Sequence, residues 1–258
     1  MDAGRAGVLS CRPMERRREP FQVHGYEVDA FGLLTAPALA GYLQEVAGHH
    51  AEDLGVGMEA LRARGQAWVL GRQRLQILRP VVEGEMLEVE TWPSGANRLA
   101  ALRDFAVRGE GGEVVARAVT AWFVLDLATR RPLRPDRVLD PALHPEREHV
   151  LPSPEPRLPE LGPAEREARF PVRYADIDRV LHVANTCYVG WALEAVPEET
   201  WRTRRLASLE TLYLAETRHG GAVLSRAARA GDGGFLHAVV REEDGRELAR
   251  LRTAWVAR

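Results

Sequence analysis

The fold is decided by one stretch of the sequence, Asp176-Ile177-Asp178-Arg179-Val180-Leu181-His182-Val183-Ala184-Asn185-Thr186-Cys187-Tyr188-Val189-Gly190-Trp191-Ala192-Leu193-Glu194. Its first part is polar and typical of a turn, and its second part has helical periodicity. One helical face carries Val183, Cys187, Gly190, Trp191 and Glu194. Pro197 ends the pattern because it has no N–H to donate and clashes with the preceding turn. His182 therefore precedes a helix N-terminus, where unpaired N–H groups favour negative charge, and this makes it a candidate for chemistry.

The chain contains this stretch twice. Aligning Phe170 with Phe21, an offset of 149 residues, places Asp178 on Asp29. The ends of the two halves repeat as well, because residues 116–122 match residues 249–255 at an offset of 133. The sequence is therefore a duplication, and its two copies are expected to share one fold.

The differences between the copies separate chemistry from architecture. His182 and Asn185 stand where the first copy has Leu33 and Ala36. A polar residue found in only one copy is the better candidate for chemistry, because both copies need the residues that hold the fold. The second half is therefore predicted to be the working half.

Comparison of the two copies also distinguishes two acidic residues of the second half. Glu216 has no acidic counterpart, because it aligns with Arg79. This makes it a candidate for catalysis, although a surface pair with Arg218 is also open. Asp178 has a counterpart in Asp29, so it is equally consistent with catalysis and with orienting the loop.

The composition fits two ordinary folded domains. A length of 258 residues with 45% hydrophobic content suits two units of roughly 100–150 residues. The net charge of −2 argues against nucleic acid or an anionic membrane as partner, and no apolar run approaches the roughly 20 residues of a membrane span. Cys11 and Cys187 do not form a disulfide framework, and the Arg-rich N-terminus lacks the apolar core of a secretory signal. We expect a cytoplasmic protein.

Helix and strand patterns repeat in the two halves. Thr35 is a fair N-cap for a first helix with Pro37 in its first turn, and a second helix begins near Val183. First-half strands are expected over 21–28, 68–77, 86–92, 99–108 and 114–125. Second-half strands are expected near 170 and over 208–214, 222–230, 235–241 and 247–257. In the 68–77 strand, Val69, Leu75 and Ile77 should share the buried side.

One helix followed by antiparallel strands is an α+β layout in which the helix packs on one face of a sheet. The Pro-rich connection between the halves reads as an extended linker. We expect four segments, namely a disordered tail over 1–20, a first half over 21–138, a linker over 139–169 and a second half over 170–258.

These residues also resemble one family. The Asp176–Asp178 run leading to His182 and Trp191, with Ala67-Trp68-Val69-Leu70 and Thr91-Trp92-Pro93-Ser94-Gly95, is similar to the acyl-acyl carrier protein (acyl-ACP) thioesterases of plants and bacteria. The resemblance covers nearly the whole chain after Phe21. It implies a double hot-dog fold, in which each sheet wraps around a long helix, with the acyl channel largely in the first half.

The resemblance also implies an activity and a partner. The activity is hydrolysis of fatty acyl thioesters to free fatty acid and holo-ACP in fatty acid biosynthesis. The partner is ACP, which carries the acyl chain on 4′-phosphopantetheine. Whether the chain forms a homodimer is left open.

The family's catalytic set carries over in part. Asp178 and His182 match catalytic positions, and Glu216 matches the acidic position. The family's catalytic Asn falls on Val180, whose side chain forms no hydrogen bond. Asn185 is the nearest amide that would replace it.

The expected mechanism is attack of water on the thioester carbonyl, with no metal and no bound cofactor. Glu216, with or without His182, removes the proton, and Asp178 orients His182. Backbone N–H groups at the helix start, near Val183 and Ala184, hold the developing oxyanion. The expected substrate-binding residues are Val180, Val183, Ala184 and Asn185.

Three alternatives stay open. Val180 favours a non-catalytic or weakly active acyl-ACP or acyl-CoA binding protein, and an acyl-CoA thioesterase would use the same residues. A dehydratase of the same fold is disfavoured because the motif resembles thioesterases. The sequence has no metal-ligand spacing, phosphate loop or Gly-x-Ser-x-Gly elbow, which argues against metallohydrolases and serine hydrolases. Cys187 is expected in the core and not as a nucleophile.

Overall fold

Two repeats of one pattern build the chain. The structure, a computed structural model, describes residues 16–231 and 233–258. The first repeat contains β1 (Arg17–Gln22), α1 (Ala36–Asp53), β2 (Gln66–Ile77), β3 (Met86–Ala96), β4 (Ala100–Arg108) and β5 (Val114–Asp126). The second repeat contains β7 (Arg166–Pro171), α4 (Asn185–Glu194), β8 (Arg204–Tyr213), β9 (Ala222–Arg229), β10 (Phe235–Arg241) and β11 (Glu247–Ala257). Short elements lie between them, namely α2 (Met58–Arg62), β6 (Pro132–Leu133), α3 (Pro135–Val138) and α5 (Glu198–Thr203).

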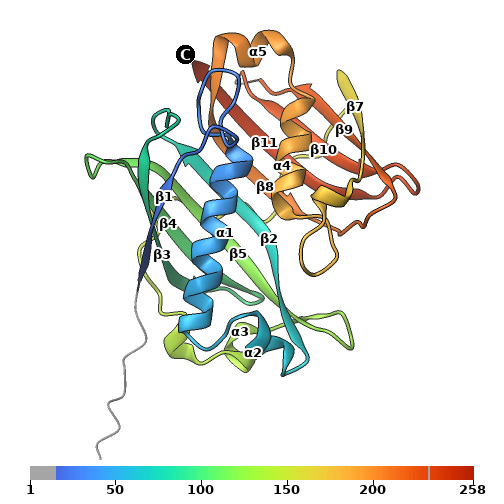
Figure 1. Ribbon diagram of the computed structural model, residues 1–258. Helices are drawn as coiled ribbons and strands as arrows, with labels where there is room; N and C mark the ends of the chain where they lie inside the picture. The colour runs from blue at the N-terminus through green and yellow to red at the C-terminus, as the bar shows by residue number, and fades with distance from the viewer. Residues whose placement is uncertain (1–15, 232) are drawn as a thin grey trace, which may run out of the picture.

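The strands form one continuous antiparallel sheet. Its order is β1-β3-β4-β5-β2-β8-β11-β10-β9-β7, and β6 pairs with β5. The second half of this order mirrors the first, so a pseudo-two-fold axis passes between β2 and β8, where Arg72–Gln76 pair with Ser208–Leu212. Helices α1 and α4 lie side by side, each cradled by its own half of the sheet (Figure 1). The expected α+β tandem arrangement is confirmed.

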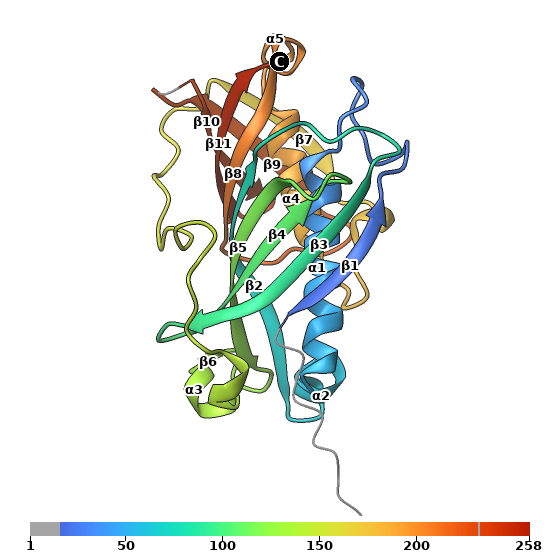
Figure 2. The ribbon, with the colours of Figure 1, turned by 90° about the vertical axis from the view of Figure 1, so that its left-hand side faces the viewer.

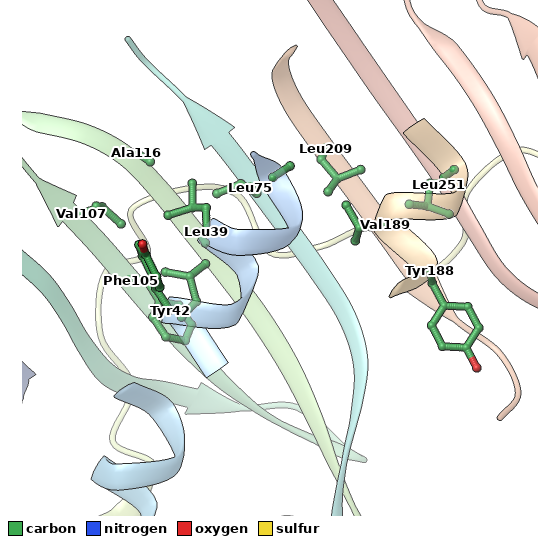
Figure 3. Packing of buried hydrophobic residues seen from close by; sticks show 14 of the residues in the cluster. Leu39, Tyr42, Leu75, Phe105, Val107, Ala116, Tyr188, Val189, Leu209 and Leu251 are labelled. Carbon is green, nitrogen blue, oxygen red and sulfur yellow. The ribbon is translucent and has the colours of Figure 1, made fainter. Parts of the chain in front are cut away.

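One hydrophobic core joins the two halves. Figure 3 shows Leu39 of α1 beside Leu75 of β2, and Val189 of α4 beside Leu209 of β8. These four side chains are buried and belong to a single cluster. Burying each such side chain stabilises the fold by about 1.5–3 kcal/mol. The main core is therefore shared by the two halves, and a smaller cluster of Val56, Leu61, Val124 and Leu139 adds to the first half.

The start of the chain differs from the expectation. Strand β1 runs over Arg17–Gln22 and pairs with β3, whereas residues 1–20 were expected to be a disordered tail and the strand was expected over 21–28. Arg18 pairs with Glu90 at 3.0 Å, and Glu90 is buried on β3. A buried carboxylate needs cationic partners, and this explains why an Arg-rich segment forms an edge strand. Residues 1–15, including Cys11, lie outside the described part of the chain.

The connection between the halves runs along the face of the sheet opposite the helices (Figure 2). Two buried carboxylates fasten it. Asp104 of β4 accepts hydrogen bonds from the His149 ring and the Val150 N–H, each at 2.7 Å, and Glu210 of β8 accepts from the Glu155 N–H at 2.6 Å. The connection is therefore anchored to both halves, and β7 begins inside the range expected for the linker. No helix in residues 16–231 or 233–258 is long and apolar enough to cross a membrane.

Candidate active site

Asp178 holds the loop that precedes α4. Its Oδ1 accepts the N–H of Val180 at 2.9 Å and the N–H of His182 at 3.2 Å. Its own N–H donates to the His182 carbonyl at 2.8 Å. Between them, Leu181 adopts a φ of +65°, which few residues other than glycine tolerate. Asp178 therefore orients His182 through the backbone.

The loop before α1 is built in the same way. Asp29 Oδ1 accepts the N–H of Phe31 at 2.9 Å and the N–H of Leu33 at 3.1 Å. Gly32, with a φ of +72°, takes the place of Leu181. Because the copy without a histidine has the same loop, these contacts of Asp178 serve architecture in both copies.

His182 and Glu216 meet at the start of α4. The His182 Nδ1 lies 3.1 Å from Glu216 Oε2. The Val183 N–H donates to the Thr217 carbonyl at 3.1 Å, and this bond sets the segment carrying Glu216 beside the helix. The His182 side chain is 24% exposed and the Glu216 side chain 46%, so water reaches both. A carboxylate on Nδ1 leaves Nε2 of the ring available to accept a proton.

An arginine of the first half also binds Glu216. Arg130, in the turn between β5 and β6, places Nη2 2.5 Å from Glu216 Oε1. Arg241 Nη2 donates to the Glu216 carbonyl at 2.7 Å. Glu216 is therefore fixed at both ends, and its cationic partner is Arg130, not Arg218. Sequence reasoning missed Arg130 because 86 residues separate it from Glu216.

The amides expected to hold the oxyanion are already in use. The Val183 N–H is bonded to Thr217, and the Ala184 N–H donates to the Asp176 carbonyl at 2.9 Å. These two N–H groups are therefore not free to hold an oxyanion, contrary to the expectation. Both bonds serve to fix the loop against its neighbours.

The next two amides, those of Asn185 and Thr186, have no hydrogen-bond partner within the described residues. They open helix α4, whose N-cap, Ala184, offers no side-chain acceptor. In α1, by contrast, the Thr35 hydroxyl caps the helix by accepting the Ala38 N–H at 3.3 Å. The second copy therefore keeps an uncapped helix start beside its histidine, and such a start attracts negative charge.

Two further predicted residues lie at the site. Asn185 Nδ2 donates to Gln44 Oε1 on α1 at 3.2 Å, so its amide is directed toward the first half. Val180 is 44% exposed on the loop surface.

The Cys187 thiol is half-buried, and burial raises its pKa to about 11, which argues against a nucleophile. Within residues 16–231 and 233–258, no group of three His, Cys, Asp or Glu side chains is arranged to hold a metal.

The position of Glu216 has a different counterpart from the one expected. In the first half, the Leu34 N–H donates to the Val81 carbonyl at 2.9 Å, which is the same bond as that from Val183 to Thr217. Pro80 therefore occupies the place of Glu216. Arg79, one residue earlier, pairs with Glu85 at 2.5 Å and also with Glu113. The conclusion that the first half lacks this acid is unchanged.

Comparisons with known proteins agree with this geometry. The family models described as acyl-ACP thioesterase N-terminal domain and C-terminal domain match residues 15–141 and 162–257. Oleoyl-acyl carrier protein thioesterase 2, chloroplastic, of Arabidopsis thaliana is 29% identical, over 92% of this chain and 76% of that protein. Palmitoyl-acyl carrier protein thioesterase, chloroplastic, of Cuphea hookeriana is also 29% identical, over 92% of this chain and 61% of that protein.

Solved structures show the same likeness over nearly full length. The 12:0-ACP thioesterase from Umbellularia californica matches with a TM-score of 0.85 and 25% identity, covering 95% of this chain and 98% of that one. An acyl-ACP thioesterase from Bacteroides thetaiotaomicron matches with a TM-score of 0.83 and 26% identity, covering 94% and 98%. The double hot-dog fold is thereby confirmed, and the chain belongs to the acyl-ACP thioesterase family.

Proposed function

We propose that this chain hydrolyses fatty acyl thioesters carried on ACP, releasing a free fatty acid and holo-ACP in fatty acid biosynthesis. The observation that carries the proposal is the pair of His182 and Glu216 beside the unpaired amides of Asn185 and Thr186. Attack of water on a thioester needs an acid–base group and a place for the oxyanion, and this loop offers both. Membership of the family supports the same reaction.

The reaction follows from these groups. Water attacks the carbonyl carbon while Glu216, directly or through His182, takes one of its protons. Negative charge then develops on the carbonyl oxygen, which the amides of Asn185 and Thr186 at the positive end of α4 stabilise. When the carbon–sulfur bond breaks, the proton passes to the departing thiolate. Arg130 keeps Glu216 in place throughout.

Val180 favours a second candidate, a slow enzyme or an acyl-binding protein. A family position that carries a polar amide is apolar here, and Asn185 directs its own amide to Gln44. Loss of a positioned polar group typically costs about 10²–10³ in kcat. We therefore expect turnover below that of a family member with the complete set.

ACP is the favoured carrier. Exposed arginines surround the site, among them Arg130, Arg179 and Arg218. Guanidinium groups suit the phosphate of phosphopantetheine, and membership of the acyl-ACP thioesterase family favours ACP as the carrier of that group. Coenzyme A contains the same phosphopantetheine, so acyl-CoA hydrolysis is the alternative to be tested. The homodimer and the cytoplasmic location stay predictions.

A product assay tests the proposal. The purified chain is incubated with acyl-ACP and acyl-CoA of matched chain lengths, and free thiol and fatty acid are quantified. We expect equal amounts of both products and a higher kcat/KM on acyl-ACP. An enoyl thioester would indicate a dehydratase, a preference for acyl-CoA would move the substrate to coenzyme A, and binding without turnover would establish a carrier-binding protein.

A further inference from the structure

A cavity of about 480 Å³ lies at the other end of the helix pair, away from His182 and Glu216. It lies between the loop before α1 and the C-terminal half of α4, and its lining includes Leu33, Ala36, Gly190 and Leu193. At the offset of 149, each has a counterpart around the catalytic loop, respectively His182, Asn185, Gly41 and Gln44. The cavity is therefore the pseudo-symmetric copy of the catalytic site.

This second site has lost every group that the chemistry needs. Leu33 replaces the histidine, Pro80 occupies the place of the acid, and Thr35 caps the helix end that α4 leaves open. The space has nevertheless been kept, and its volume is within the range of about 300–1,000 Å³ typical of small-molecule sites. A duplicated site without catalytic groups but with a cavity suits binding without reaction.

The lining indicates the class of ligand. Most of it is apolar, including Leu34, Leu39, Val107, Trp201, Leu206 and Trp255. Long hydrocarbon chains are bound by walls of this kind.

One guanidinium in the lining has no anionic partner. Arg205 lines the cavity, its Nη1 is buried without a hydrogen-bond partner, and no carboxylate of the described residues pairs with it. Arg258, the other arginine of the lining, is already engaged by Asp29 at 3.5 Å and by the ring of Phe31. Arg205 as a whole is half-buried, but a buried guanidinium N–H without a partner is costly, and an anionic head group would satisfy it.

We propose that this cavity is a non-catalytic binding site for a long-chain carboxylate, with the hydrocarbon chain against the apolar lining and the carboxylate on Arg205. A free fatty acid has this chemistry. That the enzyme itself supplies the fatty acid rests on the proposed function, whereas the binding does not.

Titration calorimetry with sodium dodecanoate tests the site in the full-length chain. His182→Ala serves as the background, so that the result does not depend on turnover. Gly41→Leu fills the catalytic side, and Gly190→Leu, its counterpart, fills the second cavity. An added Cβ at Gly190 would lie 3.8 Å from Pro37, an ordinary contact, and at Gly41 it meets no atom within 4 Å.

In the Gly41→Leu chain we expect one saturable dodecanoate site, and adding Gly190→Leu should abolish it. Arg205→Gln should weaken dodecanoate by about tenfold, the loss of one charge-assisted contact, and leave dodecanol unchanged because it has no charge to lose. Loss of all binding in Gly41→Leu alone would overturn the proposal. An equal effect of Arg205→Gln on both ligands would overturn the role of the carboxylate.

A second measurement needs no substitution in the cavity. A dodecanoate carrying a photoreactive diazirine on its chain is cross-linked to the His182→Ala protein, and the labelled peptides are mapped by mass spectrometry. We expect labels within residues 29–39 and 190–206. Labels confined to the surroundings of Asn185 and Gln44 would contradict the second site.

Discussion

The two loops that open α1 and α4 share a backbone and differ in chemistry. In both, an aspartate Oδ1 accepts the N–H groups two and four residues later, and a residue with positive φ lies between them. His182 follows this frame in one loop and Leu33 in the other. Duplication has therefore kept the frame twice, and we propose that a few side chains decide which copy reacts.

One buried ring differs between the cores beneath the two helices. Phe105 of β4 pairs with Ala118, and His237 of β10 pairs with Leu251, the residue matching Ala118. Both side chains are fully buried. The first half therefore has a phenyl ring where the second has an imidazole, bonded through Nε2 to the Thr253 hydroxyl at 3.0 Å.

Among substitutions that leave His182 in place, the largest difference between the halves should come from the two loop aspartates. Asp178→Ala frees the backbone of His182, and a displacement of about 1 Å in a catalytic group costs about 10²-fold in rate. We expect that loss in kcat for acyl-ACP hydrolysis. Asp29→Ala removes the same two bonds from the loop before α1, so kcat should stay within about twofold of the parent. The free energy of unfolding should fall by about 1 kcal/mol in both variants. Equal losses of kcat in the two variants would contradict the assignment of the working half.

Acid should destabilise the core of the second half through His237, and the core of the first half has no such histidine at the matching position. Burial lowers the pKa of His237 to about 4, while an unfolded histidine has a pKa of about 6.5. Below about pH 6.5 the unfolded chain binds a proton on His237 that the native chain does not bind. The free energy of unfolding therefore falls as the pH drops toward 4. At pH 5 this loss is about 2 kcal/mol. In His237→Phe, which introduces the residue of the first half, the free energy of unfolding measured with urea should change little between pH 7 and 5. The exposed control His49→Gln should keep the pH dependence of the parent. An unchanged pH dependence in His237→Phe would refute this account.

Substitution of Val180 can restore the asparagine that the family carries in the loop before α4. Val180→Asn restores the family amide on a half-exposed loop residue and should raise kcat by more than about tenfold with KM nearly unchanged, because the contact acts in the transition state. If the role has moved to Asn185, then Asn185→Ala should be the damaging change and Val180→Asn should do little. A readily measured activity that responds to neither substitution would remove this position from the mechanism.

The smallest effect should come from Arg130, a residue of the first half that contacts the site. Arg130→Gln removes the ion pair on Glu216 Oε1 but leaves the contact between Glu216 Oε2 and His182. Because the pair is partly exposed, we expect kcat to fall by only about threefold to tenfold. Arg131→Gln, at the adjacent exposed residue, is the matched control. Equal values for the two variants would show that Arg130 is a surface charge without a positioning role.

Much of the fold could be predicted from the sequence because the pattern found in one repeat can be checked against the other. Periodicity located β10 and β11 at their observed bounds, and Thr35 and Pro37 marked the start of α1. Val69 was expected on the buried side of β2 but is 39% exposed. A bulge between Leu70 and Arg72 reverses the faces, and Gly71 permits it because a Cβ there would overlap the ring of Phe123.

The residues of the site could be predicted where the two repeats differ. Comparison of the repeats singled out His182, Asn185 and Glu216, whereas Asp178 recurs as Asp29 and was left open. The amides that hydrogen bonds leave free, the clamp from Arg130 and the cavity at the second site depend on contacts between distant segments, which periodicity does not encode. Spacing alone assigned the oxyanion to Val183 and Ala184, two residues before the free amides.

The central claim is that one of two equivalent loops performs the chemistry, and one measurement tests it most directly. It is the kcat/KM for acyl-ACP hydrolysis of His182→Ala beside that of Leu33→Ala, the substitution at the equivalent residue. Loss of a positioned acid–base group should lower the first value by about 10²–10⁴-fold, and the second should stay within about threefold of the parent. Parental kcat/KM in His182→Ala, with an unchanged acyl-chain profile, would contradict the claim.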